Sequence, residues 1–263
     1  MAMSDLSVSV DDFNEKGFVI LDTESFDISV REMSYNVVKF IKDCAFHSLP
    51  SSDHDNLGDY ITDIHKIETE NQITSKIYQF LPSVPDLYRF ATQDCLIDNI
   101  KMLGLHSPAL GTVPLVRIDR PKEEKFLTPW HQDYWYSYAS LDSVVVWIPL
   151  GPLTKEHGKL NVAINTHKNG EVKYREFVEG NEPYVADLDI KQEQTLEVEV
   201  NFGEILIFKQ SLLHKSGYNQ SDSCRVSMQL RFNEMYKQEF PFSSFVAKHS
   251  DYVKDRQIKS LSK

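Results

Sequence analysis

Two short segments of the chain carry residue types that bind metal ions. The first is residues 128–133 (Thr-Pro-Trp-His-Gln-Asp), in which His131 and Asp133 stand two residues apart. On a strand, side chains at this spacing point to the same side, so an imidazole nitrogen and a carboxylate oxygen can reach one ion together. The second segment, residues 213–217, follows an apolar run and contains His214, which lies 83 residues downstream of His131.

Two histidines and one carboxylate on one side of a metal ion form the facial triad of non-haem iron oxygenases. Such an ion keeps open positions for a co-substrate and oxygen, whereas a structural zinc site is closed by a fourth protein ligand. The pair His131 and Asp133 taken alone fits an ordinary hydrogen-bonded pair at a strand edge equally well. The interpretation as a metal site therefore depends on what else lies near these residues.

Arg225 favours the metal site. It lies 11 residues after His214 and begins an apolar strand, residues 225–232. An arginine that faces a pocket needs an anionic partner, because an unpaired buried guanidinium is costly. A guanidinium also binds a carboxylate through two parallel hydrogen bonds. This position suits the far carboxylate of a dicarboxylic co-substrate bound to the metal.

The predicted secondary structure that positions these residues changes from mainly helical to mainly β along the chain. Before residue 111 the sequence predicts helices at 11–16 and 29–47, with a strand at 17–21 and a loop at 51–59. Two or three more helices are predicted over 75–105, broken around Pro82 and Pro85. After residue 111 come short β-branched or alternating runs, separated by turn residues, at 113–118, 143–148, 159–164, 195–200, 204–208 and 225–232. This order predicts a sandwich or barrel of sheets supported by helices. Residues 171–194 are charged and weakly periodic, which indicates an excursion from the sheets, and long excursions near a site often serve as lids.

Composition and charge restrict the classes of partner. The chain has 263 residues and a net charge of −11, which argues against nucleic acid and an anionic membrane as partners. Three widely spaced cysteines do not make a disulfide framework, so we expect a reducing, cytoplasmic setting. The polar, acidic start is not a signal peptide, and no apolar stretch reaches the roughly 20 residues of a membrane span. The oligomeric state is left open.

From residue 129 to residue 232 the chain resembles the phytanoyl-CoA dioxygenase-like family of Fe(II)/2-oxoglutarate oxygenases. The resemblance is carried by Trp130-His131-Gln132-Asp133, Trp147, Gly158-Lys159-Leu160, residues 166–170, residues 203–208, residues 214–219 and Arg225. It implies a mainly β fold with flanking helices around a double-stranded β-helix core, of the jelly-roll or cupin-like type. We expect a single domain over 1–263, with helical support over 1–110, the core over 111–235 and a tail over 236–263.

The resemblance also implies the roles of individual residues. His131, Asp133 and His214 are the expected ligands of Fe(II), and Arg225 is the expected partner of the C5 carboxylate of 2-oxoglutarate. Ser216 matches a position that helps to bind the co-substrate, and Trp147 matches an aromatic position beside it, although Trp147 also fits a plain core tryptophan. The expected reaction hydroxylates a small organic substrate with O2 while 2-oxoglutarate is decarboxylated to succinate.

Two departures from the family pattern affect the site. Ile164-Asn165-Thr166-His167 replaces the family's Pro-Gly-Ser-His, and Arg120-Pro121 replaces a lysine before a proline. Arg117 is weakly favoured over Arg120 as a contact of the co-substrate, although both also fit solvated charges at a strand end. Four aromatic residues after the motif are candidates for the substrate approach, although packing beneath a loop explains them as well: Tyr134, Trp135, Tyr136 and Tyr138.

Three other hypotheses remain open from the sequence. A cupin-type oxygenase that does not use 2-oxoglutarate would share the triad, but it would not need a cation at Arg225. A non-catalytic module that binds a metal or a small molecule would not need open positions on the metal. Structural zinc at the same three residues is the third.

Overall fold

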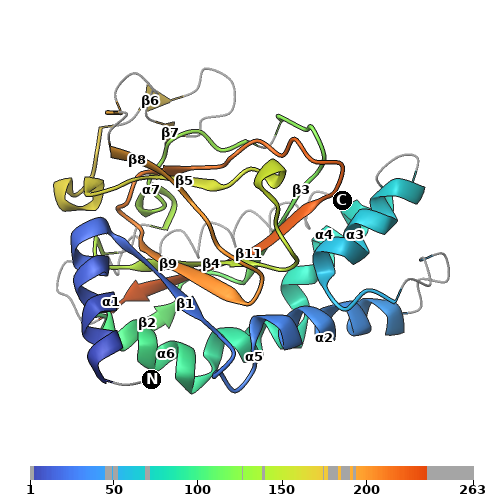
Figure 1. Ribbon diagram of the computed structural model, residues 1–263, viewed down its shortest axis with the longest axis horizontal. Helices are drawn as coiled ribbons and strands as arrows, with labels where there is room; N and C mark the ends of the chain where they lie inside the picture. The colour runs from blue at the N-terminus through green and yellow to red at the C-terminus, as the bar shows by residue number, and fades with distance from the viewer. Residues whose placement is uncertain are drawn as a thin grey trace, which may run out of the picture.

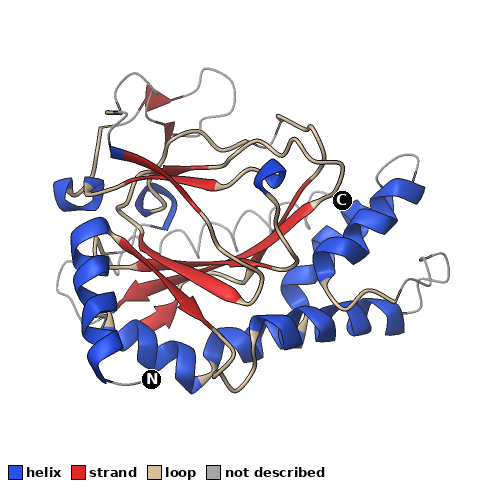
Figure 2. Cartoon of the chain, in the orientation of Figure 1, coloured by secondary structure: helices blue, strands red, loops and turns tan. Residues whose placement is uncertain are grey.

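The computed structural model describes residues 3–44, 49, 53–68, 72–125, 127–137, 140–173, 175–176, 183–184, 190–191 and 194–235 (Figures 1 and 2). Its α-helices are α1 (Met3–Lys16), α2 (Val30–Asp43), α3 (Leu57–Ile67), α4 (Gln72–Phe80), α5 (Pro85–Thr92), α6 (Asp94–Met102) and α7 (Tyr134–Ser137). Short 3-10 helices follow at η1 (Leu81–Ser83), η2 (Lys155–His157) and η3 (Thr166–Asn169). The strands are β1 (Phe18–Asp22), β2 (Pro108–Leu110), β3 (Leu115–Asp119), β4 (Val144–Pro149), β5 (Leu160–Ala163), β6 (Arg175–Glu176), β7 (Pro183–Tyr184), β8 (Thr195–Val198), β9 (Glu204–Lys209), β10 (His214–Lys215) and β11 (Arg225–Glu234).

Two antiparallel sheets face each other. The larger has the order β1-β9-β4-β11-β2, with β3 also paired to β11, and the smaller has the order β10-β5-β8. In Figure 1 the helices α2, α5 and α6 run along the side of the larger sheet that faces away from β5 and β8. The prediction of a mainly β fold with flanking helices and a jelly-roll core is therefore confirmed.

The central strand β4 shows how one sequence builds two apolar layers. All six of its residues are buried. Val144, Val146 and Ile148 pack with the helices, whereas Val145 and Trp147 pack between the two sheets. Because successive side chains of a strand point to opposite faces, a strand covered on both faces is apolar throughout. The interior between the sheets is the layer that holds the functional side chains.

The elements expected from the sequence are largely present. All six strands predicted after residue 111 are found within a few residues of their expected bounds. The helix expected at 29–47 is α2, which ends earlier, at Asp43 with Cys44 as its C-cap. The expected loop at 51–59 is corrected, because Asn56 caps the start of α3 by accepting a hydrogen bond from the backbone N–H of Asp59. The short strands β2 and β10 were not predicted, since each spans only two or three residues.

Several expectations fall on residues that the structure does not describe. The tail at 236–263 is one, and much of the excursion at 171–194 is another, although β6 and β7 pair within it. A lid at 171–194 and a single domain over 1–263 stay predictions. Cys44, Cys95 and Cys224 are free thiols, and none of the described helices has the length and apolar run that a bilayer span requires.

Candidate metal centre

An antiparallel bridge brings the two histidines together across the interior. The backbone N–H of His131 donates to the carbonyl of His214, and that of His214 donates to the carbonyl of His131, each at 3.0 Å. His214 belongs to β10, which pairs with β5 of the smaller sheet. The motif does not continue as a strand beyond this bridge, and Asp133 lies in a turn immediately before α7. The convergence of the ligands therefore comes from the turn and not from strand alternation.

The turn is held by hydrogen bonds from both sides. The Gln132 amide donates to the carbonyls of Ser211 and Gly170, and its oxygen accepts from the N–H of Val172. The backbone N–H of Tyr134 donates to the carbonyl of Gln210. Gln132 is fully buried, and these contacts tie the turn to residues 210–211, which lie just before His214 in the chain. They fix Asp133 opposite the two imidazoles.

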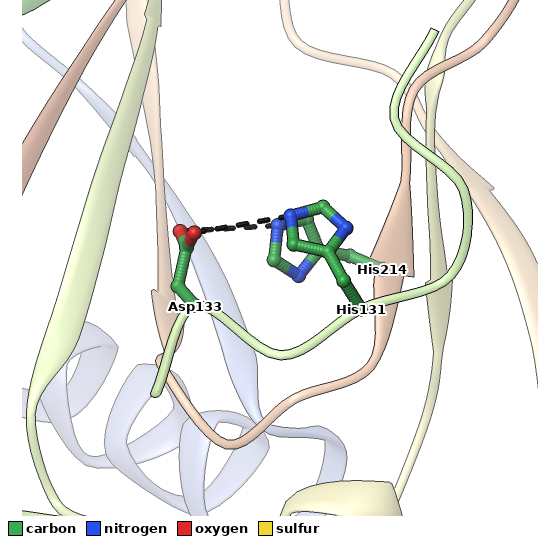
Figure 3. Close-up of side chains that lie close together, drawn as sticks. All are labelled: His131, Asp133 and His214. Atoms are coloured by element: carbon green, nitrogen blue, oxygen red, sulfur yellow. Dashed lines mark ion pairs between the residues drawn. The ribbon is translucent and has the colours of Figure 1, made fainter. Parts of the chain in front are cut away.

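The three side chains present their ligand atoms to a common point. One atom each from His131, Asp133 and His214 lies within 4.8 Å of the others. Asp133 Oδ1 is 3.8 Å from His131 Nε2, and Asp133 Oδ2 is 3.9 Å from His214 Nε2 (Figure 3). These separations are longer than hydrogen bonds but suit donors arranged around one ion. All three residues are buried.

Hydrogen bonds orient both imidazole rings. His131 Nδ1 lies 2.8 Å from the carbonyl of Pro129, and His214 Nδ1 lies 3.0 Å from that of Leu212. A carbonyl only accepts, so each Nδ1 carries the proton and each Nε2 offers a lone pair to the ion. Phe208 packs edge-on against His214, with ring centroids 4.7 Å apart.

The charges of the three residues match what a metal requires. Burial, together with the neighbouring His214, lowers the pKa of His131 to about 3. Burial also lowers the pKa of His214. For Asp133, burial raises the pKa, but the guanidinium of Arg231 and the two histidines outweigh it and hold the pKa well below its ordinary value. Two neutral imidazoles and one carboxylate are the protonation states that a metal ion binds.

The donor set fits a divalent first-row ion with open positions. Two imidazole nitrogens and one carboxylate oxygen are the ligands of the 2-His-1-carboxylate site, and they occupy one face of the ion. Within the described residues, this is the group of metal-binding side chains that meets the geometric requirement.

Arg231 is a site residue that the sequence analysis missed. Its Nη2 donates to Asp133 Oδ1 at 2.8 Å and to Gln229 Oε1 at 3.2 Å. Arg231 lies on β11 and is six residues beyond Arg225, so both side chains point to the same face of the strand. That even spacing was visible in the sequence and would have placed Arg231 in the interior.

Arg225 lies in a separate ionic cluster. Its Nε and Nη2 donate to Asp119 Oδ2 at 3.1 and 3.0 Å, and its Nη1 donates to the carbonyl of Gly158. Arg117 donates to Asp119 Oδ1 at 2.9 Å and to Thr128 Oγ1 at 2.8 Å. Burial raises the pKa of Asp119, but the two arginines outweigh it and lower the pKa below its ordinary value. Burial is the main cause of the lowered pKa of His214, and the charge of Arg117 contributes to it.

Two cavities adjoin this cluster. One, of about 580 Å³, is lined by Arg117, Asp119 and Arg120. The other, of about 500 Å³, is lined by Gly158, Lys159 and Ser216. Ser216 donates its backbone N–H to the carbonyl of Thr128, and Thr128 lines both cavities.

The aromatic candidates are spread over different environments. Trp147 is buried between the sheets, and Trp135 packs with Trp130 in a small cluster beside the triad. Tyr134 is partly buried, and burial raises its pKa. Tyr136 belongs to α7 but its side chain is not described, and Tyr138 lies outside the described residues. Their roles toward a substrate stay predictions.

Residues 105–227 match the family model described as Phytanoyl-CoA dioxygenase (PhyH). The predicted resemblance to this family is confirmed. The matched segment contains both histidines, Asp133 and Arg225.

Two curated relatives match part of the chain. A 1-deoxypentalenic acid 11-beta-hydroxylase from Streptomyces exfoliatus is 34% identical over 118 residues, which is 41% of this chain and 42% of the relative. The protein of the same name from Streptomyces arenae is 34% identical over 121 residues, with the same coverage of 41% and 42%. The chain therefore spans about two fifths of the length of the curated relatives it matches.

Solved structures show the same fold at low sequence identity. The apo form of the non-heme monooxygenase ThoJ has a TM-score of 0.58 at 17% identity and covers 86% of this chain and 76% of its own. The epimerase SnoN in complex with Fe3+, alpha ketoglutarate and nogalamycin RO has a TM-score of 0.53 at 15% identity, covering 89% and 85%. These likenesses establish the double-stranded β-helix fold.

Proposed function

We propose that the chain is an iron(II)- and 2-oxoglutarate-dependent dioxygenase that hydroxylates a small organic substrate. The observation that carries the proposal is the buried set of one carboxylate and two neutral imidazoles, whose ligand atoms lie within 4.8 Å of one another. Three ligands on one face leave positions for two more reactants, which is what oxygenase chemistry requires. The match to the phytanoyl-CoA dioxygenase family and the hydroxylase names of the curated relatives support it.

In this proposal each residue of the triad has one task. His131 and His214 would bind iron through Nε2, and Asp133 would bind it through a carboxylate oxygen. Bound iron, with 2-oxoglutarate and oxygen, would supply the oxidising power for inserting oxygen into a C–H bond, with release of succinate and carbon dioxide. The protein's contribution is to fix the reactants in place and to exclude water.

The cationic cluster supports the use of 2-oxoglutarate. Arg225 and Arg117 carry two positive charges against the single negative charge of Asp119, so the cluster has one excess positive charge. A guanidinium has five N–H donors, and three of those of Arg225 are engaged by Asp119 and Gly158. The remaining two can donate to the C5 carboxylate, with Ser216 and Arg117 as further contacts. An oxygenase without 2-oxoglutarate gives no reason for this excess charge.

The substrate is proposed only as a class. The relatives' name specifies a carboxylic acid, so carboxylic acids belong in the first screen. Tyr134, Trp135, Tyr136 and Tyr138 would line its approach. We propose a cytoplasmic enzyme that acts on a small molecule and not on nucleic acid or a membrane.

The test is succinate release from 2-oxoglutarate by anaerobically purified protein that is loaded with Fe(II) and then exposed to oxygen. We expect turnover in the wild type, and loss of it in Asp133→Ala and Arg225→Ala. Arg89→Ala serves as the matched control, because Arg89 is an exposed arginine on α5. Wild-type protein that binds iron but consumes oxygen without succinate would indicate a cupin-type oxygenase instead. Binding of metal with no consumption of oxygen would indicate a binding module or a structural zinc site.

A further inference from the structure

Arg231 is a second cation at the metal centre, and the iron itself does not explain it. Its guanidinium shares the carboxylate of Asp133 with the proposed ion. A positive charge this close opposes the binding of a divalent cation. The side chain is only 15% exposed, so water does little to screen this repulsion. An arginine that weakens metal binding needs an anion to compensate for it.

The hydrogen bonds of Arg231 leave part of its guanidinium available. Within the described residues, both of its hydrogen bonds leave from Nη2, to Asp133 and to Gln229. Its Nε–H is buried and has no acceptor there. A buried donor without an acceptor is costly. Because the two hydrogen bonds of Nη2 engage both of its hydrogens, the donors left for a carboxylate are Nε–H and the N–H groups of Nη1.

The position of Arg231 directs its guanidinium into the interior. On β11 it pairs in register with Val145 of β4, whose side chain lies in the layer between the sheets beside Trp147. The guanidinium therefore reaches the triad from the larger sheet, whereas His214 reaches it from the smaller one.

The charges around the triad also favour a bound anion. Metal ions bind imidazole in its neutral form, so a divalent ion, Arg231 and Asp133 together would carry two excess positive charges. An anionic group bound at the metal would be attracted by all of these charges.

We infer that Arg231 is a carboxylate-binding residue of the metal centre, which contacts a carboxylate bound at or beside the ion. This inference rests on the proposed function. Two molecules offer that group: the 1-carboxylate of 2-oxoglutarate, and the carboxylate of an acidic substrate. Arg225 lies six residues away on the strand, about 20 Å between Cα atoms, and belongs to a different cluster. One dicarboxylic co-substrate would thus meet a cation at each of its ends.

The experiment uses full-length protein loaded with Co2+ under anaerobic conditions, where Co2+ replaces iron as a spectroscopic probe. Three proteins are compared with the wild type: Arg231→Met, Arg231→Lys and the surface control Arg89→Met. The first measurement is the Co2+ affinity itself. We expect Arg231→Met to bind Co2+ as tightly as the wild type or more tightly, because a neighbouring cation has been removed.

Two titrations then identify the carboxylate. In the first, 2-oxoglutarate is added and the visible spectrum of Co2+ is followed. In the second, cyclohexanecarboxylate is added to protein saturated with 2-oxoglutarate. At least a tenfold loss of 2-oxoglutarate affinity in Arg231→Met, partly restored in Arg231→Lys, assigns Arg231 to the co-substrate. Unchanged 2-oxoglutarate affinity with at least a tenfold loss for cyclohexanecarboxylate assigns it to the substrate.

Other outcomes overturn the inference. Equal affinities of the wild type and Arg231→Met in both titrations, including no binding of the second probe by either, would show that Arg231 binds no carboxylate. A tenfold loss of Co2+ affinity in Arg231→Met would show that the arginine only supports Asp133. Failure of the wild type to bind Co2+ or 2-oxoglutarate is a separate result, which removes the proposed function and this inference with it.

Discussion

Asp119→Ala is expected to destabilise the protein strongly. The carboxylate of Asp119 is 12% exposed and accepts three hydrogen bonds from two arginines, at 2.9, 3.0 and 3.1 Å. Its removal leaves Arg225, whose side chain is only 5% exposed, without an anionic partner. Removing one partner of a buried ion pair lowers the free energy of unfolding by about 3–5 kcal/mol. For a chain of this size, at about 2–4 °C per kcal/mol, the melting temperature should fall by roughly 6–20 °C.

The same reasoning predicts coupling between Asp119 and Arg225. The double variant removes Arg225, the more buried of the two arginines that pair with Asp119, so Asp119→Ala/Arg225→Met should be no less stable than Asp119→Ala alone. Unfolding in urea, followed by circular dichroism, measures each free energy. Asp222→Ala is the matched control, since Asp222 lies 2.8 Å from Lys122 but is 93% exposed, and we expect no measurable change. A cost below about 1 kcal/mol for Asp119→Ala, or additive costs in the double variant, would refute the account of this cluster.

Three further predictions concern other parts of the fold. Burial and the nearby Arg225 lower the pKa of His157 below 6.5 in the folded protein. Below about pH 6.5 the unfolded chain therefore binds a proton at this residue that the folded chain does not, so the free energy of unfolding falls as the pH drops. His157→Gln should flatten this pH dependence in urea unfolding measured across the same range. Gly217→Ala should cost about 1–3 kcal/mol, because its new Cβ would overlap the carbonyl oxygen of Lys159; an unchanged melting temperature would show that the backbone moves aside. Asn56→Ala should cost about 1 kcal/mol through loss of the cap of α3, and Asn56→Asp should retain most of the stability in the same assay.

The strands and the three ligands were predictable because their signals are local. Alternating and β-branched runs predicted β4, β9 and β11, and residue type with spacing predicted His131, Asp133 and His214. Helix α3 carried a usable signal as well. Its buried residues Leu57, Tyr60, Ile61 and Ile64 follow helical spacing, but the polar segment before them was interpreted as a loop that extended too far.

The ionic contacts were not predictable because they depend on strand register. Asp119 lies directly opposite Arg225 in the pairing of β3 with β11, and no local pattern fixes that register. The contact between Arg231 and Asp133 joins residues 98 positions apart. Such pairs are set by how whole sheets pack, so the sequence indicated only that an interior arginine needs an anion.

The most direct test of the central claim is the visible absorption of anaerobic protein loaded with Fe(II) when 2-oxoglutarate is added. We predict a new absorption band that saturates at one 2-oxoglutarate per chain, is absent with glutarate, and is lost in Asp133→Ala. Protein that binds Fe(II) at these three residues but shows no band at saturating 2-oxoglutarate would contradict the claim.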